Sequence, residues 1–247
     1  MSNPPSSSPA APKLSSVGFE AREVGVVKSV REFIVMATGM PSCVNGQLVE
    51  FKSGVKGMVM GFKEDDVQIL ALGPHSALRA GDEIYNKGEI LTIPVGEKFL
   101  GRMVNALAEP VDGLGPIVSN EEYPLFREAP GVMDRVPVDQ TLETGTKILD
   151  AVIPIAKGQR QLLIGDRLTG KTSIALDCIL NQKGKGVICV YCCIGKTYSN
   201  LLKVLSLLKE RDALDYTIVV SGIASVPEGQ QFLSPYTACT LGEYFMY

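Results

Sequence analysis

The sequence contains a single histidine, His75, and no long uninterrupted run of apolar residues. A Ser-His-Asp or Cys-His mechanism would depend on His75 alone, and nothing near this residue supports either mechanism. No apolar run approaches the ~20 residues that are needed to span a bilayer. The first residues do not have the pattern of a signal peptide, so we expect none. We therefore expect no direct insertion into a membrane.

The chain also lacks an excess of charge of one sign. Its formal net charge is -3, which gives no electrostatic reason to expect a nucleic-acid partner. Hydrophobic residues make up 45% and charged residues 21% of the sequence, which is typical of a globular protein. The 247 residues are enough for one large domain or two small ones.

The cysteines do not form a recognisable metal site. Without a signal peptide, a reducing compartment and free thiols are expected. Cys189 and Cys192 have C-x-x-C spacing, which allows a metal or redox site. Their surroundings instead predict one buried strand, on which residues three apart point to opposite faces. No second cysteine pair completes a zinc site. The six cysteines are Cys43, Cys178, Cys189, Cys192, Cys193 and Cys239.

A phosphate-binding motif, G-x-x-x-x-G-K-[ST], is the strongest signal in the sequence. It consists of Gly165, Asp166, Arg167, Leu168, Thr169, Gly170, Lys171 and Thr172. The apolar run 161–164 before it predicts a buried strand, and residues 173–180 after it have helical apolar spacing. This order aims backbone N–H groups and a helix N-terminus at a phosphate chain. Lys171 is expected to reach the β- and γ-phosphates, and the Thr172 hydroxyl to bind Mg²⁺.

The N-terminal part of the chain predicts a small β domain. Residues 1–19 form a flexible tail rich in serine, proline and alanine, and residues 20–95 alternate short strands with turns. This pattern predicts a small closed barrel or a sandwich. No cluster of convergent polar residues is evident there, so we expect a structural or assembly module. The candidate strands are 23–30, 33–37, 47–51, 56–62, 67–72, 83–86 and 90–94.

Residues 96–247 predict an α/β domain. The stretch 114–140 is expected to be irregular but packed, and 144–155 to be a helix on which Ile148, Leu149 and Val152 share one face. The chain then alternates helices and strands, which implies a mainly parallel sheet. The helices are predicted at 171–182, 199–211 and 229–247, and the strands at 187–194 and 217–220. In the second of these helices, Leu201, Leu202, Leu205 and Leu208 have helical spacing and are expected to pack in the core.

The phosphate-loop domain is expected to be truncated. No apolar strand ending in an aspartate for Mg²⁺ follows the loop in the sequence. The chain is therefore expected to be a fragment, or to have its sheet completed by another polypeptide.

The residues around the loop also resemble a known family. The run 158–172, with Leu100-Gly101-Arg102-Met103 and Pro235-Tyr236 among further matches, is similar to alpha subunits of F-type ATP synthases over about residues 20–247. The resemblance implies a six-stranded barrel and a RecA-like nucleotide-binding domain. It implies alternation with beta subunits in an alpha3-beta3 ring, with gamma and peripheral-stalk subunits as further partners.

The same resemblance implies a location and a ligand. The complex is peripheral, on the ATP-producing side of an energy-transducing membrane: bacterial cytoplasm, plastid stroma or mitochondrial matrix. Alpha chains hold MgATP or MgADP without turning it over, while the adjacent beta subunits perform proton-driven ATP synthesis.

Two positions depart from the family pattern. Lys196 stands where alpha chains carry glutamine and beta chains carry the glutamate that polarises the attacking water. A charged lysine cannot accept a proton, so the loop is expected to bind nucleotide without hydrolysing it, and we predict no catalytic residue. Leu168 replaces a glutamine of the family loop, which weakens the expected affinity. The resemblance also places the cation of Lys196 near the γ-phosphate, so Lys196 is expected to be a further nucleotide-binding residue. The alternatives are a freestanding phosphate-loop ATPase and a degenerate alpha-like assembly fragment without nucleotide binding.

Overall fold

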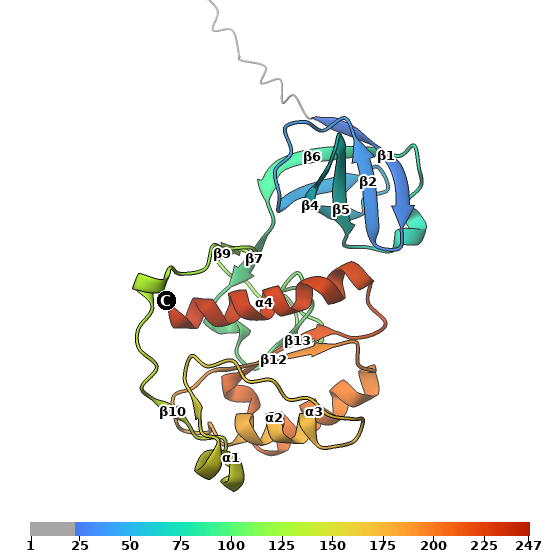
Figure 1. Ribbon diagram of the computed structural model, residues 1–247. Coiled ribbons are helices and arrows are strands. Elements are labelled where there is room, and N and C mark those ends of the chain that lie inside the picture. Colours follow the sequence, from blue (N-terminus) through green and yellow to red (C-terminus); the bar gives the residue numbers. More distant parts are fainter. Residues whose placement is uncertain (1–22) are drawn as a thin grey trace, which may run out of the picture.

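The computed structural model describes residues 23–247 (Figure 1). The predicted flexible tail, residues 1–19, lies outside the described residues. Within the described part, a β-barrel lies at one end and an α/β domain at the other (Figure 1). This arrangement confirms the predicted fold class.

The barrel is closed by six antiparallel strands in the order β1-β2-β5-β4-β3-β6. The strands are β1 (Val24–Arg31), β2 (Ile34–Thr38), β3 (Gln47–Phe51), β4 (Lys56–Lys63), β5 (Asp66–Ala71) and β6 (Glu83–Ile90). Alternate side chains point into the barrel, because successive residues of a strand face opposite sides. Val35, Ile69 and Ile84 are fully buried there, with Phe51 at 1% exposure.

The end of the barrel differs from the sequence prediction. The break expected at Lys87 and Gly88 lies inside β6, where residues 87–89 bulge relative to β3. Gly88 has a φ of +71°, a conformation that glycine adopts without strain. The next strand, β7 (Thr92–Val95), leaves the barrel and pairs with β9 (Glu121–Pro124).

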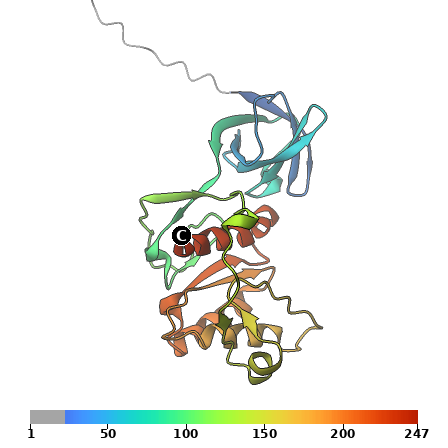
Figure 2. The ribbon, with the colours of Figure 1, turned by 60° about the vertical axis from the view of Figure 1, so that its left-hand side comes forward.

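The α/β domain is built on a short parallel sheet in the order β12-β13-β8. Its strands are β12 (Cys189–Ile194), β13 (Thr217–Gly222) and β8 (Met103–Val104). The helix α4 (Glu228–Met246) covers one face, and α2 (Lys171–Leu180) and α3 (Tyr198–Glu210) cover the other (Figures 1 and 2). Apart from the strand predicted at 161–164, the predicted helices and strands are present within a few residues, whereas β8 was not predicted.

Side chains alternate between the two faces of this sheet. Ile218 and Val220 pack on the α4 side, and Val219 packs on the α2 and α3 side. The same alternation separates the C-x-x-C cysteines, as predicted. Cys192 packs on the α4 side, whereas Tyr191, which shares a strand face with Cys189, packs on the α2 and α3 side. All six cysteines are free.

The helix α4 also joins the two domains. At its N-terminus Gln230 Nε2 donates to the carbonyl of Leu72, 2.8 Å away in the barrel. Gly229 packs so closely that an added Cβ would lie 2.0 Å from the carbonyl oxygen of Ala71. Barrel residues such as Leu70 share one buried cluster with Leu233 of α4. The barrel is therefore packed on α4 rather than tethered by a linker.

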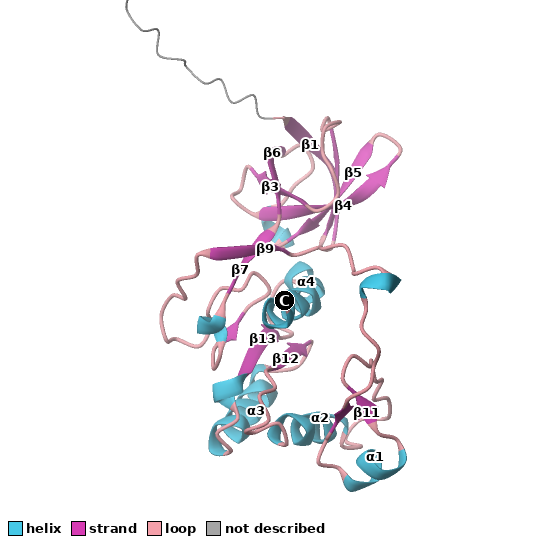
Figure 3. Ribbon diagram, turned by 90° about the vertical axis from the view of Figure 1, so that its left-hand side faces the viewer, coloured by secondary structure: helices cyan, strands magenta, loops and turns pink. Residues whose placement is uncertain are grey.

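The segment between β9 and α2 departs most from the prediction (Figure 3). It contains a 3₁₀ turn at Val132–Asp134, the short helix α1 (Lys147–Val152) and the paired strands β10 (Thr141–Leu142) and β11 (Ile155–Ala156). Residues 127–141 are exposed rather than packed, and Ile148 and Val152 of α1 are each 69% exposed. The helix is shorter than expected because Asp150 accepts bonds from the backbone of Thr144 and Gly145 and holds that end as a turn.

Two further predictions of buried side chains were wrong. Residues 161–164 form no strand, and Leu162 and Ile164 are 75% and 85% exposed. A buried parallel strand needs neighbours to pair with, and none lies beside this run among residues 23–247. In α3, Leu201 and Leu208 are fully buried as expected, but Leu202 is 43% exposed.

Four short 3₁₀ helices complete the described elements. They are His75–Ala77, Glu97–Phe99, Val132–Asp134 and Leu214–Tyr216. Within residues 23–247, no helix combines the length and the apolar character needed to cross a membrane.

Candidate functional site

The phosphate loop lies between the exposed run 161–164 and the first turn of α2. Gly170 precedes the helix with a φ of +88°, a left-handed conformation that glycine adopts readily. Leu168 also has a positive φ, +64°, which costs free energy for a side chain with a Cβ. The loop therefore has the tight turn that the motif predicted, although the strand before it is missing.

The N-terminus of α2 has no side-chain cap. The first N–H groups of a helix have no partner within the helix, and side-chain caps usually satisfy some of them. Here the residue in the cap position is Gly170, which has no side chain to offer. The uncapped amide groups and the helix dipole together suit an anion such as a phosphate.

Lys171 is turned back onto its own loop. Its Nζ donates to the carbonyl of Gly165 at 2.7 Å, and also donates to the carbonyl of Asp166. The Thr169 hydroxyl lies 3.4 Å from the same nitrogen and donates to Asp166 O at 2.9 Å. The ammonium group is thus held by loop oxygens, which a phosphate would have to replace.

The remaining loop side chains are open to solvent. Asp166, Arg167 and Thr172 are exposed, and the side chain of Leu168 is completely exposed. The Thr172 hydroxyl makes no hydrogen bond within residues 23–247, so it is free to reach a cation. The same part of the chain contains no group of three or more His, Cys, Asp or Glu side chains arranged for a metal. The loop thus fits a phosphate-bound Mg²⁺ better than a metal held by protein alone.

The far end of α2 is fixed to the domain. Leu176 is buried beside Leu201 and Cys193, and the Tyr216 hydroxyl donates to Ile179 O at 3.1 Å. Gln182 Nε2 donates to Glu143 O at 2.8 Å and ties the helix end to the segment before α1. The helix is therefore a firm base for the loop. These anchoring residues had no signal in the sequence, because their partners are far away along the chain.

Lys196 lies at the carboxyl end of β12, in the turn that leads to α3. Gly195 N donates to Gly222 O at 2.9 Å, and Ala224 N donates to Lys196 O at 3.0 Å, so the turn is fixed against the end of β13. No hydrogen bond or ion pair within the described residues joins Lys196 to residues 165–172. The structure thus gathers Gly165 to Thr172 in one loop, and among the described residues no hydrogen bond or ion pair links Lys196 to that loop.

The half-buried thiols of Cys189 and Cys192 in β12 are not suited to nucleophilic chemistry. Burial raises the pKa of Cys189 to about 11 and that of Cys192 to about 12. Both groups therefore stay protonated at neutral pH, whereas the reactive form of a cysteine is the thiolate.

Comparison with protein families matches both domains. The nucleotide-binding domain of the ATP synthase alpha/beta family matches residues 145–247, and the beta-barrel domain of the same family matches residues 20–88. The chain belongs to the ATP synthase alpha/beta family. The first match includes the whole loop and Lys196, and the second includes all but the end of the barrel.

Family membership has two general consequences. The nucleotide-binding domain identifies a nucleotide as the ligand class, and the family implies a hetero-oligomeric ATP synthase complex. Both matched descriptions name alpha and beta chains together, so they give the family and not the type of chain.

Proposed function

We propose that the chain is a non-catalytic, nucleotide-binding alpha-type subunit of a rotary ATP synthase, or the N-terminal part of one. The observation that carries the proposal is Lys196, which follows β12 at the position where a catalytic chain would need glutamate. A lysine that is charged at neutral pH has no lone pair to accept a proton from water. The chain would then support proton-driven ATP synthesis at sites on its beta-type neighbours.

The proposed ligand is MgATP or MgADP. Lys171 and the backbone N–H groups at the start of α2 would hold the phosphates, and the Thr172 hydroxyl would contribute one Mg²⁺ ligand. For this to happen, Lys171 must leave the carbonyl oxygens of Gly165 and Asp166. Binding of a polyphosphate should offset that loss, because charge-assisted bonds to phosphate are stronger than those to neutral carbonyls.

The proposed partners are beta-type subunits in an alternating alpha3-beta3 ring, with gamma and peripheral-stalk subunits. In this assembly the chain would be peripheral to an energy-transducing membrane, on the side where ATP is made. The packing of the barrel on α4 through Gly229 and Gln230 supports this role, since a crown of barrels must be rigidly connected to the nucleotide-binding domains.

One alternative is favoured by particular observations. A degenerate assembly chain without nucleotide binding is consistent with the missing strand at 161–164 and with Lys171 bound to its own loop. Such a chain would keep the barrel and its contacts while the loop had lost its ligand. A freestanding ATPase would need a general base, and Lys196 cannot serve as one.

The purified chain with MgATP separates the three functions. Titration calorimetry measures binding, and release of inorganic phosphate measures turnover. Binding without turnover is the expected result. Turnover by the chain alone would exclude the non-catalytic role, and a lack of binding by a correctly folded chain would favour the degenerate assembly role.

A further inference from the structure

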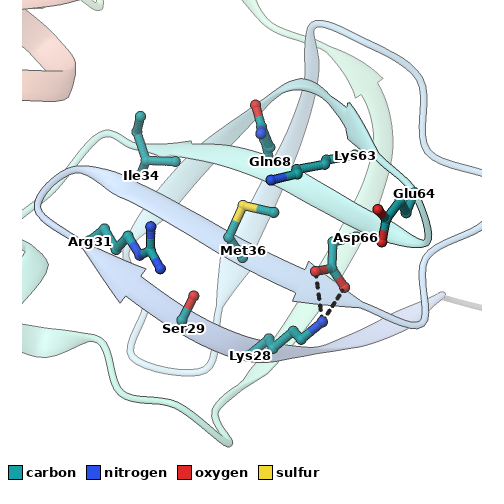
Figure 4. A pocket seen from close by; sticks show the side chains of 9 residues that line it. All are labelled: Lys28, Ser29, Arg31, Ile34, Met36, Lys63, Glu64, Asp66 and Gln68. Atoms are coloured by element: carbon teal, nitrogen blue, oxygen red, sulfur yellow. Dashed lines mark hydrogen bonds and ion pairs between the residues drawn. The ribbon is translucent and has the colours of Figure 1, made fainter.

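A cavity of about 560 Å³ lies on the outer face of the barrel (Figure 4). Its lining residues are far along the chain from the phosphate loop. It is formed by β1, β2, the end of β4 and the start of β5. Sequence analysis found no convergent polar cluster in this domain, and that conclusion was wrong. The lining residues are spread between positions 28 and 68, so only the pairing of the strands brings them together.

Two β-bulges explain why this face is hollow. The register of β1 shifts between Val27 and Ser29, and that of β4 shifts between Val59 and Gly61. Bulges bend a strand and increase its twist, so the strands on both sides of the β2–β5 pair curl around it. Gly61 lies opposite Gln68 and contributes no side chain, which leaves that end of the floor open.

The lining of the cavity carries three cations, Lys28, Arg31 and Lys63, and two carboxylates, Glu64 and Asp66, so its formal charge is +1. Lys28 Nζ lies 2.8 Å from Asp66 Oδ2, so this pair is neutralised. Arg31 and Lys63 are exposed and have no ion pair within residues 23–247. Figure 4 shows Arg31 and Lys63 on different sides of Met36, with Glu64 and the Lys28–Asp66 pair on the side away from Arg31. The part of the cavity around Arg31 and Met36 therefore attracts negative charge.

The floor between the two free cations is apolar. Met36 is half-buried there, and Ile34 next to it is 42% exposed. All six strands of the closed barrel have neighbours on both sides, so a ligand cannot add to the sheet as another strand. A ligand must instead be recognised through its side chains. The volume lies within the ~300–1,000 Å³ that is usual for binding pockets.

We propose that this cavity docks a short acidic peptide segment of a partner protein. Carboxylates of the segment pair with Arg31 and Lys63, and an apolar side chain between them covers Met36 and Ile34. This surface lies on the barrel and is independent of nucleotide binding at residues 165–172. It gives the barrel a specific binding role in addition to its structural one.

The test uses the full chain and two short fluorescent peptides, one alternating glutamate with leucine and one alternating glutamate with serine. Fluorescence anisotropy should show that the leucine peptide binds more tightly. We expect R31E/K63E to weaken its binding about tenfold or more, because attraction becomes repulsion at both contacts. The matched control is K56E/K203E, which changes the net charge equally at exposed lysines outside the cavity and should bind normally.

A second variant tests the apolar floor. M36Q should remove the preference for the leucine peptide while leaving salt-dependent binding of the serine peptide unchanged. Equal melting temperatures would show that the variants are folded. Failure of the wild-type chain to bind either peptide would overturn the proposal. Equal weakening by K56E/K203E would also overturn it, since binding would then reflect net charge alone.

Discussion

The barrel and the segment around the phosphate loop are both rich in valine, isoleucine and leucine, but only the barrel buries them. In the barrel every strand has two neighbours, and Ile69 and Ile84 are fully buried. In residues 141–170, which include the phosphate loop, the only strand pairing joins β10 and β11, and each of these strands has two residues. Leu162 and Ile164 remain exposed. The difference shows that an apolar run becomes a buried strand only where neighbouring strands are available.

The largest expected difference is in the cost of changing one apolar residue in each region. Phe51→Ala in the barrel should reduce the free energy of unfolding by about 3–5 kcal/mol, because it leaves a cavity in a closed core. Leu162→Ser should change it by no more than about 0.5 kcal/mol. Hydrogen exchange of barrel peptides measures the effect of Phe51→Ala, and denaturant unfolding measures the effect of Leu162→Ser. A large cost for Leu162→Ser would mean that this run is buried in solution.

The junction between the domains offers a matched pair of glycines on α4. Gly229→Ala should destabilise the chain by about 1–3 kcal/mol, because its Cβ meets the carbonyl of Ala71 and the helix must move. Gly242→Ala has only an ordinary contact with Val190 and should stabilise the helix by about 0.5–1 kcal/mol. Thermal unfolding distinguishes the two. Similar shifts for both variants would disprove the close packing of α4 on the barrel.

A smaller effect is expected where β8 joins the parallel sheet. Arg102 Nε lies 2.6 Å from Asp112 Oδ2, and this hydrogen bond holds the pKa of Asp112 at about 2. Because the pKa is lower in the folded chain, the stabilisation is present above pH ~4 and is lost as the pH falls towards 2. Asp112→Asn should cost roughly 2 kcal/mol at neutral pH and flatten this acid dependence. An unchanged acid dependence of unfolding in the variant would contradict the role of the pair.

Much of the fold could be predicted from the sequence, and the failures have a common cause. Alternating strands with turns predicted the barrel, helical spacing predicted α2 and α3, and the alternating order of strands and helices predicted α4. The run 161–164 has the composition of a buried strand, but composition does not supply the neighbours that bury it. The cavity on the barrel was missed for a related reason, since β-bulges and strand pairing place Arg31 and Lys63 together without any local motif.

The candidate site was predicted unevenly. The motif located the turn at Gly170 and the start of α2, because these depend on local backbone chemistry. It did not predict that Lys171 would be bonded to Gly165 and Asp166, because the motif describes the loop with phosphate present. It also could not predict the anchoring of α2 through Gln182, which depends on a distant carbonyl.

The most direct test of the account is amide hydrogen exchange of the loop with and without MgATP. If the loop binds the phosphates, MgATP should slow exchange in peptides spanning residues 159–176 of the wild-type chain. Lys171→Ala should abolish this protection, because it removes the charged contact to the β- and γ-phosphates. Equal protection in the variant, or protection confined to other parts of the chain, would contradict nucleotide binding at this loop.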